Sequence, residues 1–224
     1  HTGTFKDLAA TVVASVLREN NIDAYVVAST GNIANAYARY LAAAGITLYV
    51  FLPSNSNRTQ EAQIAAYGQK VFRVNGDYAR AKAIAAEFAT THGIPLAAGN
   101  FDPMRIEAKK TMVYEWLRQL KKMPDVYIQA LSGGTGPLGI EKAFHELEGE
   151  DILKEYPRQI MIQSDRCAPM AIGWEQAVHN SFPDGWENDY PILKNPETNI
   201  PTLSTGDPKT YPVIAPFVRK TGGA

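Results

Sequence analysis

Residues 23–53, DAYVVASTGNIANAYARYLAAAGITLYVFLP, decide the fold class of this 224-residue chain. A short β-rich run at 23–28 leads into a polar loop at 29–32, a helical pattern then extends to Ala43, and a second apolar strand follows at 46–52. A strand, a helix of ten or more residues and a further strand form a right-handed crossover unit, which places the two strands parallel in one sheet. The stretch therefore predicts an α/β fold.

The alternation of short strands and longer helices continues on both sides of this stretch. Helical patterns occur at 5–19, 59–67, 77–92, 103–120 and 138–147. Further strands are expected at 69–74, 96–98, 126–131 and 159–163. From Ser181 on, prolines, glycines and asparagines interrupt the periodicity, so we expect irregular loop or a linker between subdomains there. The whole pattern predicts mainly parallel sheet with helices on both faces.

Composition narrows the classes of function. The chain has 45% hydrophobic and 20% charged residues and a formal net charge of −1, as in ordinary globular proteins, and it lacks the basic cluster that nucleic acids or anionic membranes attract. Cys167 is the only cysteine, which excludes an intramolecular disulfide and suits a reducing cytoplasm. We expect neither secretion nor membrane insertion, since no signal-peptide pattern and no apolar stretch of membrane-spanning length occur in the sequence. It begins at His1, inside a motif, so we expect a fragment of a longer protein.

The segment HTGTFKD at 1–7 places one lysine beside an aromatic ring, after a glycine turn and directly before an amphipathic helix. Thr2 and Thr4 are residue types that cap helices, so Lys6 is expected at the helix entrance. The positive end of the helix and the apolar neighbour Phe5 both favour the neutral amine that attacks an aldehyde. A Schiff-base lysine and an ordinary surface lysine are the two interpretations of Lys6.

A glycine-rich turn, SGGTGP at 132–137, lies between a predicted strand and a predicted helix. Its backbone amides stand at a helix N-terminus, where a phosphate binds readily, and Ser132 and Thr135 add hydroxyl donors. A P-loop lysine and the GxGxxG fingerprint are both absent, so a triphosphate or NAD site is poorly supported. A small cofactor phosphate is the preferred ligand, and a purely structural turn is the alternative.

The loop at 29–32, STGN, also joins a strand to a helix. Its hydroxyls, amides and carboxamide suit a carboxylate, while helix capping by Ser29 or Thr30 is the alternative. Because ligands of parallel sheets gather beyond the carboxyl ends of the strands, we expect this loop and the 132–137 turn to face one cleft.

Other residues that could carry chemistry have ordinary interpretations. Cys167 is expected to be a small buried residue. The internal histidines lack the spacing of metal ligands, and no metal site is expected: His92, His145 and His179. Three charged residues of the helix at 103–120 could line a cleft, but they are expected on its solvated face: Arg105, Glu107 and Lys109.

The lysine segment, the 29–32 loop and the 132–140 segment, in this order, resemble the fold-type II pyridoxal-phosphate enzymes, and most closely the threonine synthases. The FDP segment at 101–103 and the residues after it are similar to a further threonine synthase segment. The resemblance covers about residues 1–175. It implies a fold like that of the tryptophan synthase β subunit, with a smaller subdomain near 1–100, a larger one near 101–224 and the cofactor cleft between them.

The resemblance also implies roles for individual residues. Lys6 would form the Schiff base with pyridoxal 5′-phosphate and shuttle protons, and Asn32 would hydrogen-bond the ring hydroxyl of the cofactor. The substrate carboxylate would be bound by Ser29, Thr30 and Gly31. The cofactor phosphate would be bound by Ser132, Gly133, Gly134, Thr135 and Gly136. The hydroxyl that faces the pyridine nitrogen has three weak candidates: Thr202, Ser204 and Thr205.

The implied reaction is an elimination and replacement on a phosphorylated amino acid, in which O-phosphohomoserine and water give threonine and phosphate. The segment at 163–168 also resembles cysteate synthase, which replaces the phosphate of O-phosphoserine with sulfite. A non-catalytic binding relative is the alternative from another class. The expected partners are a small amino-acid substrate and further copies of the chain in a homo-oligomer such as a dimer, with no nucleic acid and no membrane.

Overall fold

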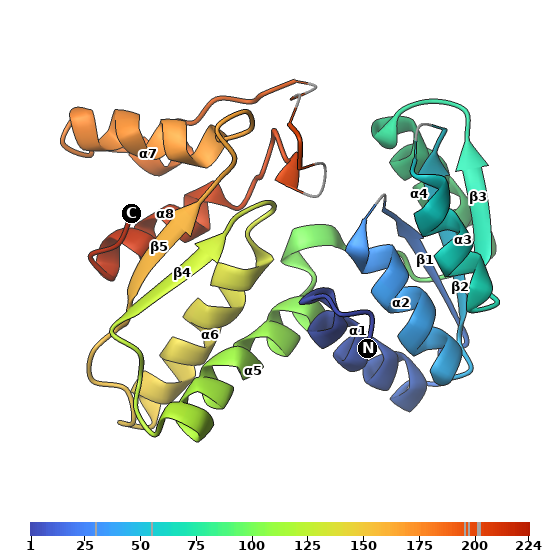
Figure 1. The fold of residues 1–224 in the computed structure, drawn as a ribbon, viewed down its shortest axis with the longest axis horizontal. Helices are drawn as coiled ribbons and strands as arrows, with labels where there is room; N and C mark the ends of the chain where they lie inside the picture. Colours follow the sequence, from blue (N-terminus) through green and yellow to red (C-terminus); the bar gives the residue numbers. More distant parts are fainter. Residues whose placement is uncertain (30, 55, 195, 197, 201–202) are drawn as a thin grey trace. The chain divides into compact units, whose positions relative to one another are not determined.

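The computed structural model describes residues 1–29, 31–54, 56–194, 196, 198–200 and 203–224. The chain forms two compact units, residues 1–108 and 109–224. Figure 1 shows the helices and strands of each unit with their labels.

Unit 1 is built around a three-stranded parallel sheet of order β1-β2-β3. Its elements are α1 (Lys6–Glu19), β1 (Ala24–Ala28), α2 (Asn32–Ala43), β2 (Thr47–Pro53), α3 (Arg58–Ala66), β3 (Lys70–Val74), α4 (Tyr78–His92), the 3-10 helix η1 (Gly99–Phe101) and the start of α5 (Pro103–Leu120). The expected crossover units are confirmed, because β1 pairs with β2 and β2 with β3 in parallel register. The strand predicted at 96–98 is only an isolated parallel bridge between Leu96 and Val26.

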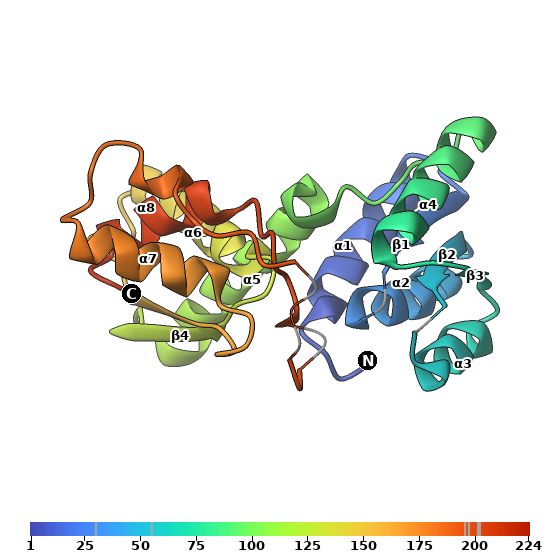
Figure 2. The ribbon, with the colours of Figure 1, turned by 90° about the horizontal axis from the view of Figure 1, so that it is seen from above.

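Side-chain alternation along β1 and β2 separates two apolar layers in unit 1. Tyr25 and Val27 of β1 pack with residues of α1, α2 and α3, whereas Val26, between them, packs with the alanines of α4. Figure 2 shows α2 and α4 on opposite sides of the strands. Since both faces of the strands are covered, β1 and β2 read as continuous apolar runs in the sequence.

Gln69 is a buried polar residue that joins the start of β2 to α2. Its carbonyl oxygen accepts from the Leu48 backbone N–H at 2.6 Å, and its amide nitrogen donates to the carbonyls of Ala38 and Ile46, both at 3.2 Å. The side chain is 8% exposed and its amide satisfies three backbone groups. Gln69 therefore fixes the start of β2 against α2.

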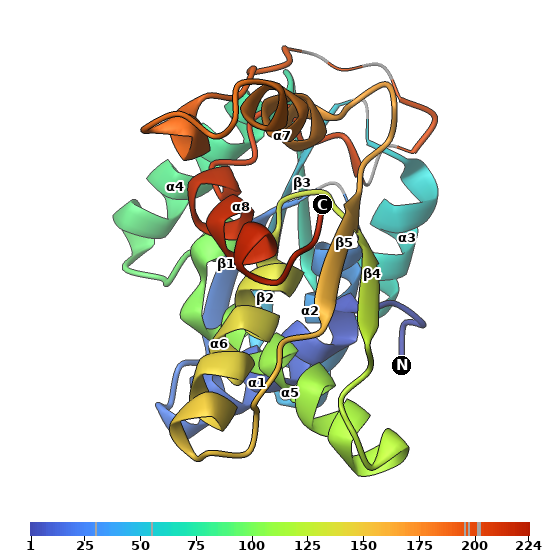
Figure 3. The ribbon, with the colours of Figure 1, turned by 90° about the vertical axis from the view of Figure 1, so that its left-hand side faces the viewer.

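Unit 2 contains a two-stranded parallel sheet, β4 with β5, visible side by side in Figure 3. Its elements are the rest of α5, β4 (Val126–Ala130), α6 (Thr135–Gly149), β5 (Arg158–Ile162), α7 (Pro169–His179), the 3-10 helix η2 (Trp186–Asn188) and α8 (Tyr211–Lys220). Tyr127 of β4 points into a core of α5, α6 and α8 side chains, while its neighbours Val126 and Ile128 are exposed. One face of this sheet is thus packed and the other open.

Helix α8 lies in the region where the sequence predicts irregular loop. Pro212 occupies its first turn, where the missing N–H costs nothing, and Pro216 lies inside it. Four of its buried residues nevertheless follow helical spacing: Tyr211, Ile214, Ala215 and Val218. The prediction of loop was wrong for this segment because tertiary packing outweighs the proline penalty. No helix among the described residues is long and apolar enough to cross a membrane.

Candidate functional site

Lys6 is the first residue of α1, as the sequence predicts. The residue before the helix is Phe5, and the Lys6 Nζ lies 4.8 Å from the centroid of the Phe5 ring. The amine therefore stands at the positive end of the helix and beside an aromatic surface.

The turn before Lys6 is held by an aspartate. Asp7, which is 8% exposed, accepts from the Thr2 backbone N–H at 2.8 Å and from the Thr2 hydroxyl at 2.6 Å. Gly3, between them, has φ of 75°, a left-handed conformation that favours glycine. The prediction that Thr2 and Thr4 cap the helix with their side chains was wrong. Instead, the Asp7 carboxylate binds the preceding loop, and the Thr4 carbonyl accepts from the Asp7 N–H.

Burial and, as the smaller cause, the positive charge of Arg105 together lower the pKa of Lys6 from 10.5 to about 8. Lys6 is half-buried, and Arg105 is only 8% exposed. The Arg105 Nη1 donates to the Gly99 carbonyl at 2.5 Å, which keeps the guanidinium inside unit 1. The prediction that Arg105 and Lys109 lie on a solvated helix face was wrong, since Lys109 is fully buried as well. No local sequence pattern distinguishes this arginine from a surface one.

Two buried tyrosines interact electrostatically with the same arginine. Burial raises the pKa of Tyr25 and Tyr37, the Asp102 carboxylate raises both further, and Arg105 opposes the rise. The Asp102 Oδ1 accepts from the Met104 N–H at 3.0 Å, at the start of α5. Lys6, Tyr25, Tyr37, Asp102 and Arg105 therefore form one electrostatically coupled group, which we call the Arg105 cluster.

The predicted carboxylate loop joins β1 to α2. Ser29 is 7% exposed. Its hydroxyl accepts from the Gly31 N–H at 3.3 Å, so it binds within its own loop and does not cap α2. Gly31 is extended, with φ of −135°, and Asn32 is the first residue of α2 and half-buried. Thr30 lies outside the described residues.

The helices that follow the predicted site segments begin without a side-chain cap, as α7 and α8 also do, whereas α3 and α4 are capped. Asn57 and Asp77 cap α3 and α4, accepting from the N–H groups of the first turn. In contrast, the residues before α1, α2 and α6 are Phe5, Gly31 and Gly134, none of which has a side chain able to accept a hydrogen bond from the first turn. A helix start without a capping acceptor is suited to an external anion.

The glycine turn between β4 and α6 is shorter than predicted, because α6 begins at Thr135 and not near Leu138. Gly134 has φ of 80°. A Cβ on Gly134 would overlap the side chains of Ile214 and Thr210, and one on Gly136 would overlap the Gln129 amide. The sequence interpretation missed this reason for glycine, which is close packing inside unit 2.

Hydroxyl residues from the end of the chain contact this turn. The Ser132 and Thr205 hydroxyl oxygens lie 2.7 Å apart, and the Thr210 hydroxyl donates to the Gly133 carbonyl at 3.0 Å. Of the three candidates for a ring-nitrogen partner, Thr205 contacts the turn, the Ser204 hydroxyl donates to the Pro196 carbonyl at 3.4 Å, and Thr202 lies outside the described residues.

The structure therefore distributes the predicted site residues over the two units. Lys6, Ser29, Gly31 and Asn32 belong to unit 1, where Lys6 is electrostatically coupled to Arg105. The second unit contains the turn residues Ser132, Gly133, Gly134, Thr135 and Gly136. The 29–32 loop and the 132–136 turn each lie between a parallel strand and the following helix, as predicted. Lys6 lies at the start of α1, before the first strand.

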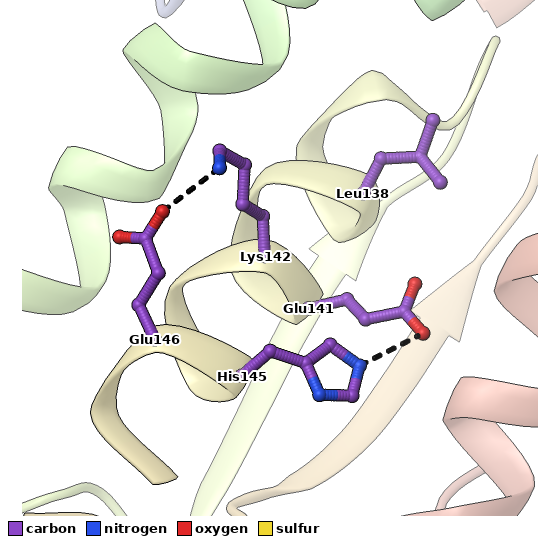
Figure 4. A pocket seen from close by; sticks show the side chains of 5 residues that line it. All are labelled: Leu138, Glu141, Lys142, His145 and Glu146. Carbon is purple, nitrogen blue, oxygen red and sulfur yellow. Dashed lines mark ion pairs between the residues drawn. The ribbon is translucent and has the colours of Figure 1, made fainter. Parts of the chain in front are cut away.

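A shallow hollow on α6 has the features of a solvated helix face. Figure 4 shows that its charged residues pair along the helix, Lys142 with Glu146 at 2.8 Å and Glu141 with His145 at 3.8 Å. Hydrogen bonds from Lys142 and Tyr114 lower the pKa of Glu146 to about 2. Within the described part of the chain, no group of three or more histidines, cysteines and carboxylates could hold a metal. The charged residues of this hollow are thus explained as i,i+4 ion pairs on a helix surface, and we assign no ligand to it.

Cys167 is buried, as predicted, at 1% exposure. Burial raises the pKa of its thiol, which disfavours the reactive thiolate.

Comparison with known proteins identifies a family. Residues 1–223 match the family model described as "Pyridoxal-phosphate dependent enzyme". A threonine synthase of Methanocaldococcus jannaschii is 30% identical over 224 residues, covering 99% of this chain and 53% of that protein. A cysteate synthase of Methanothrix thermoacetophila is 27% identical over 209 residues, covering 89% of this chain and 50% of that protein. The chain thus spans about half the length of these curated relatives.

Solved structures show the same fold. Maize serine racemase superposes with a TM-score of 0.74 at 19% identity, over 91% of this chain and 57% of that one. The processed form of threonine deaminase isoform 2 from Solanum lycopersicum superposes with a TM-score of 0.72 at 20% identity, over 92% of this chain and 52% of that one.

Proposed function

Because this chain belongs to the pyridoxal-phosphate-dependent enzyme family, we propose that it contributes to an elimination and replacement reaction on a phosphorylated amino acid. The preferred reaction converts O-phosphohomoserine and water to threonine and phosphate. The observation that carries the proposal is the half-buried Lys6 at the start of α1, whose pKa is lowered to about 8. The choice of substrate is supported by the threonine synthase that is 30% identical over almost the entire chain.

We assign to Lys6 the two tasks that need a neutral amine. The first is to attack the aldehyde of the cofactor, and the second is to take a proton at the substrate α-carbon. Both tasks fail for an ammonium, so a pKa near 8 makes this lysine more suitable than an ordinary one. When bound, pyridoxal phosphate supplies the electron sink that makes the α-proton acidic.

The remaining assignments concern charges and hydrogen bonds. Asn32 is proposed to bind the ring hydroxyl of the cofactor, and the 29–31 loop the substrate carboxylate. The helix starts after Gly31 and Gly134, which lack capping side chains, support binding of anions at these two places. The cofactor phosphate is assigned to the turn residues Ser132, Gly133, Gly134, Thr135 and Gly136.

The residues of the two loops fit the chemistry of this cofactor. The Gly31 N–H already donates to the Ser29 hydroxyl oxygen, so the Ser29 hydroxyl proton and the Asn32 N–H at the start of α2 are the groups that we assign to a carboxylate. Glycine at 134 and 136 adds no side chain of its own beside the amides at the start of α6. Pyridoxal phosphate has an aldehyde, a ring hydroxyl and a phosphate. We assign these three groups to the Lys6 amine, the Asn32 carboxamide and the 132–136 turn.

A second candidate function is replacement of the phosphate of O-phosphoserine by sulfite. It is favoured by the cysteate synthase that matches 89% of this chain at 27% identity. The two candidates share the same cofactor and the same tasks for Lys6, and they differ in substrate length and nucleophile.

The test of the proposal is turnover by the protein loaded with pyridoxal phosphate. Release of phosphate with formation of threonine from O-phosphohomoserine supports the preferred reaction, and formation of cysteate from O-phosphoserine and sulfite supports the second. Lys6→Ala serves as the control and should abolish either product. Cofactor binding without turnover of either substrate, unaffected by Lys6→Ala, would identify a non-catalytic relative and refute both.

A further inference from the structure

Thr210 has an unusual position for a helix-capping threonine. It is the residue before α8 and is fully buried. A threonine at this position ordinarily accepts a hydrogen bond from the first turn of its own helix. Thr210 does not cap α8 in this way, since its hydroxyl donates instead to the carbonyl of Gly133, 77 residues earlier, at 3.0 Å.

The contact between Thr210 and the glycine turn is close as well as polar. A Cβ added to Gly134 would lie 2.5 Å from the Thr210 hydroxyl oxygen and would overlap Ile214 of α8. Gly134 therefore packs directly on the start of α8, in a conformation with φ of 80° that glycine allows. A second hydroxyl pair, Ser132 with Thr205 at 2.7 Å, fixes the first residue of the turn to the segment that precedes α8.

The hydrogen bond to Gly133 determines the direction of the next amide. In a trans peptide, the carbonyl of one residue and the N–H of the following residue point to opposite sides of the same plane. Anchoring the Gly133 carbonyl on Thr210 thus turns the Gly134 N–H away from α8. Two consecutive glycines restrict this peptide very little, so its orientation depends on such an anchor.

We propose that Thr210 is a positioning residue that holds the Gly133–Gly134 peptide in the orientation needed to bind the phosphate of the cofactor. This inference rests on the proposed function, in which the 132–136 turn binds that phosphate. Thr210 acts through the peptide and does not itself contact the ligand. Loss of its hydroxyl removes one neutral hydrogen bond from the turn, which corresponds to about a three- to tenfold change in affinity.

The test compares two ligands, pyridoxal 5′-phosphate and pyridoxal, which differ only in the phosphate. Dissociation constants are measured for the complete chain by absorbance titration, with folding of each variant checked by circular dichroism. Thr210→Val keeps the shape of the side chain and removes the hydroxyl, whereas Thr210→Ser keeps the hydroxyl. Thr221→Val is the matched control, because Thr221 lies just after the other end of α8 and its hydroxyl contacts Val218 and Gln159.

We expect Thr210→Val to bind pyridoxal phosphate about three- to tenfold more weakly and pyridoxal as well as the wild type does. Thr210→Ser and Thr221→Val should bind both ligands within twofold of the wild type. Should Thr210→Val not fold, Thr210→Cys, with its weak donor, is measured in its place with the same expectation.

The inference is overturned if the hydroxyl-free variant binds pyridoxal phosphate like the wild type, if it weakens both ligands equally, or if Thr210→Ser fails to restore binding. A wild-type chain that takes up neither ligand would refute the proposed function itself and the role of Thr210 with it. A wild-type preference for the phosphorylated ligand combined with an unaffected Thr210→Val would leave the proposed function intact and remove only this inference.

Discussion

The basicity of Lys6 can be changed by removing the charge of Arg105. With a pKa of about 8, about 9% of the Lys6 side chains are neutral at pH 7, against about 0.03% for a lysine at 10.5. The reactive fraction is thus raised about 300-fold, and it increases as the pH rises through 8. Because the folded pKa lies below the unfolded one, this group also makes stability rise with pH between about 8 and 10.5.

Burial is the larger cause of the low pKa and Arg105 the smaller one, so Arg105→Gln should recover less than half of the difference between 8 and 10.5. We expect a pKa above 8 but below about 9.3 in this variant. Arg105→Lys, which keeps the positive charge, is the matched control and should remain near 8.

The assay is competitive acetylation of the folded protein with a trace of isotopically labelled anhydride over a range of pH, followed by mass spectrometry of the Lys6 peptide. Lys220 provides an internal reference, because its hydrogen bond with the Tyr156 hydroxyl raises its pKa. A wild-type Lys6 that titrates at 10 or above would refute the account of the amine. An Arg105→Gln value equal to that of the wild type would remove Arg105 as a cause.

Three further predictions concern stability and are checked by urea unfolding. Gly134→Ala should destabilise the protein by about 1–3 kcal/mol, because the new Cβ overlaps α8 at a positive φ, whereas Gly149→Ala, with open space around it, should not destabilise it; equal effects would refute the packing argument. Asp7→Ala should cost about 1–3 kcal/mol by releasing two hydrogen bonds from Thr2, and Asp7→Asn should cost less; an unchanged midpoint for Asp7→Ala would contradict this role. Gln69→Leu should cost about 1–3 kcal/mol because it leaves the buried Leu48 N–H without an acceptor, and a neutral effect would show that the backbone groups find other partners.

The sequence predicts local elements well where hydrophobic periodicity is uninterrupted. The helix expected at 103–120 has the observed bounds of α5, and the strand, loop and helix at 23–43 occur as predicted. Helix α8 was missed because Pro212 and Pro216 hide its pattern, although the first proline lies in a turn that tolerates it.

In the candidate site, too, local features could be predicted from the sequence, whereas contacts between residues far apart in the chain could not. The position of Lys6 at a helix start beside Phe5 is local and could be predicted. Its coupling to Arg105 and the bond from Thr210 to Gly133 join residues far apart in the chain, and no spacing rule reports them. The sequence singles out the glycines of the turn as ligands of a phosphate, whereas the close packing of Gly134 against α8 depends on a helix that the sequence does not reveal.

We assign the covalent binding of the cofactor to Lys6. The most direct test of this assignment is borohydride reduction of the chain incubated with pyridoxal 5′-phosphate, followed by proteolysis and mass spectrometry. We predict a single stable adduct on the peptide that contains Lys6, and none in Lys6→Ala. An intact protein without an adduct, or with its adduct on a different lysine, would contradict the account.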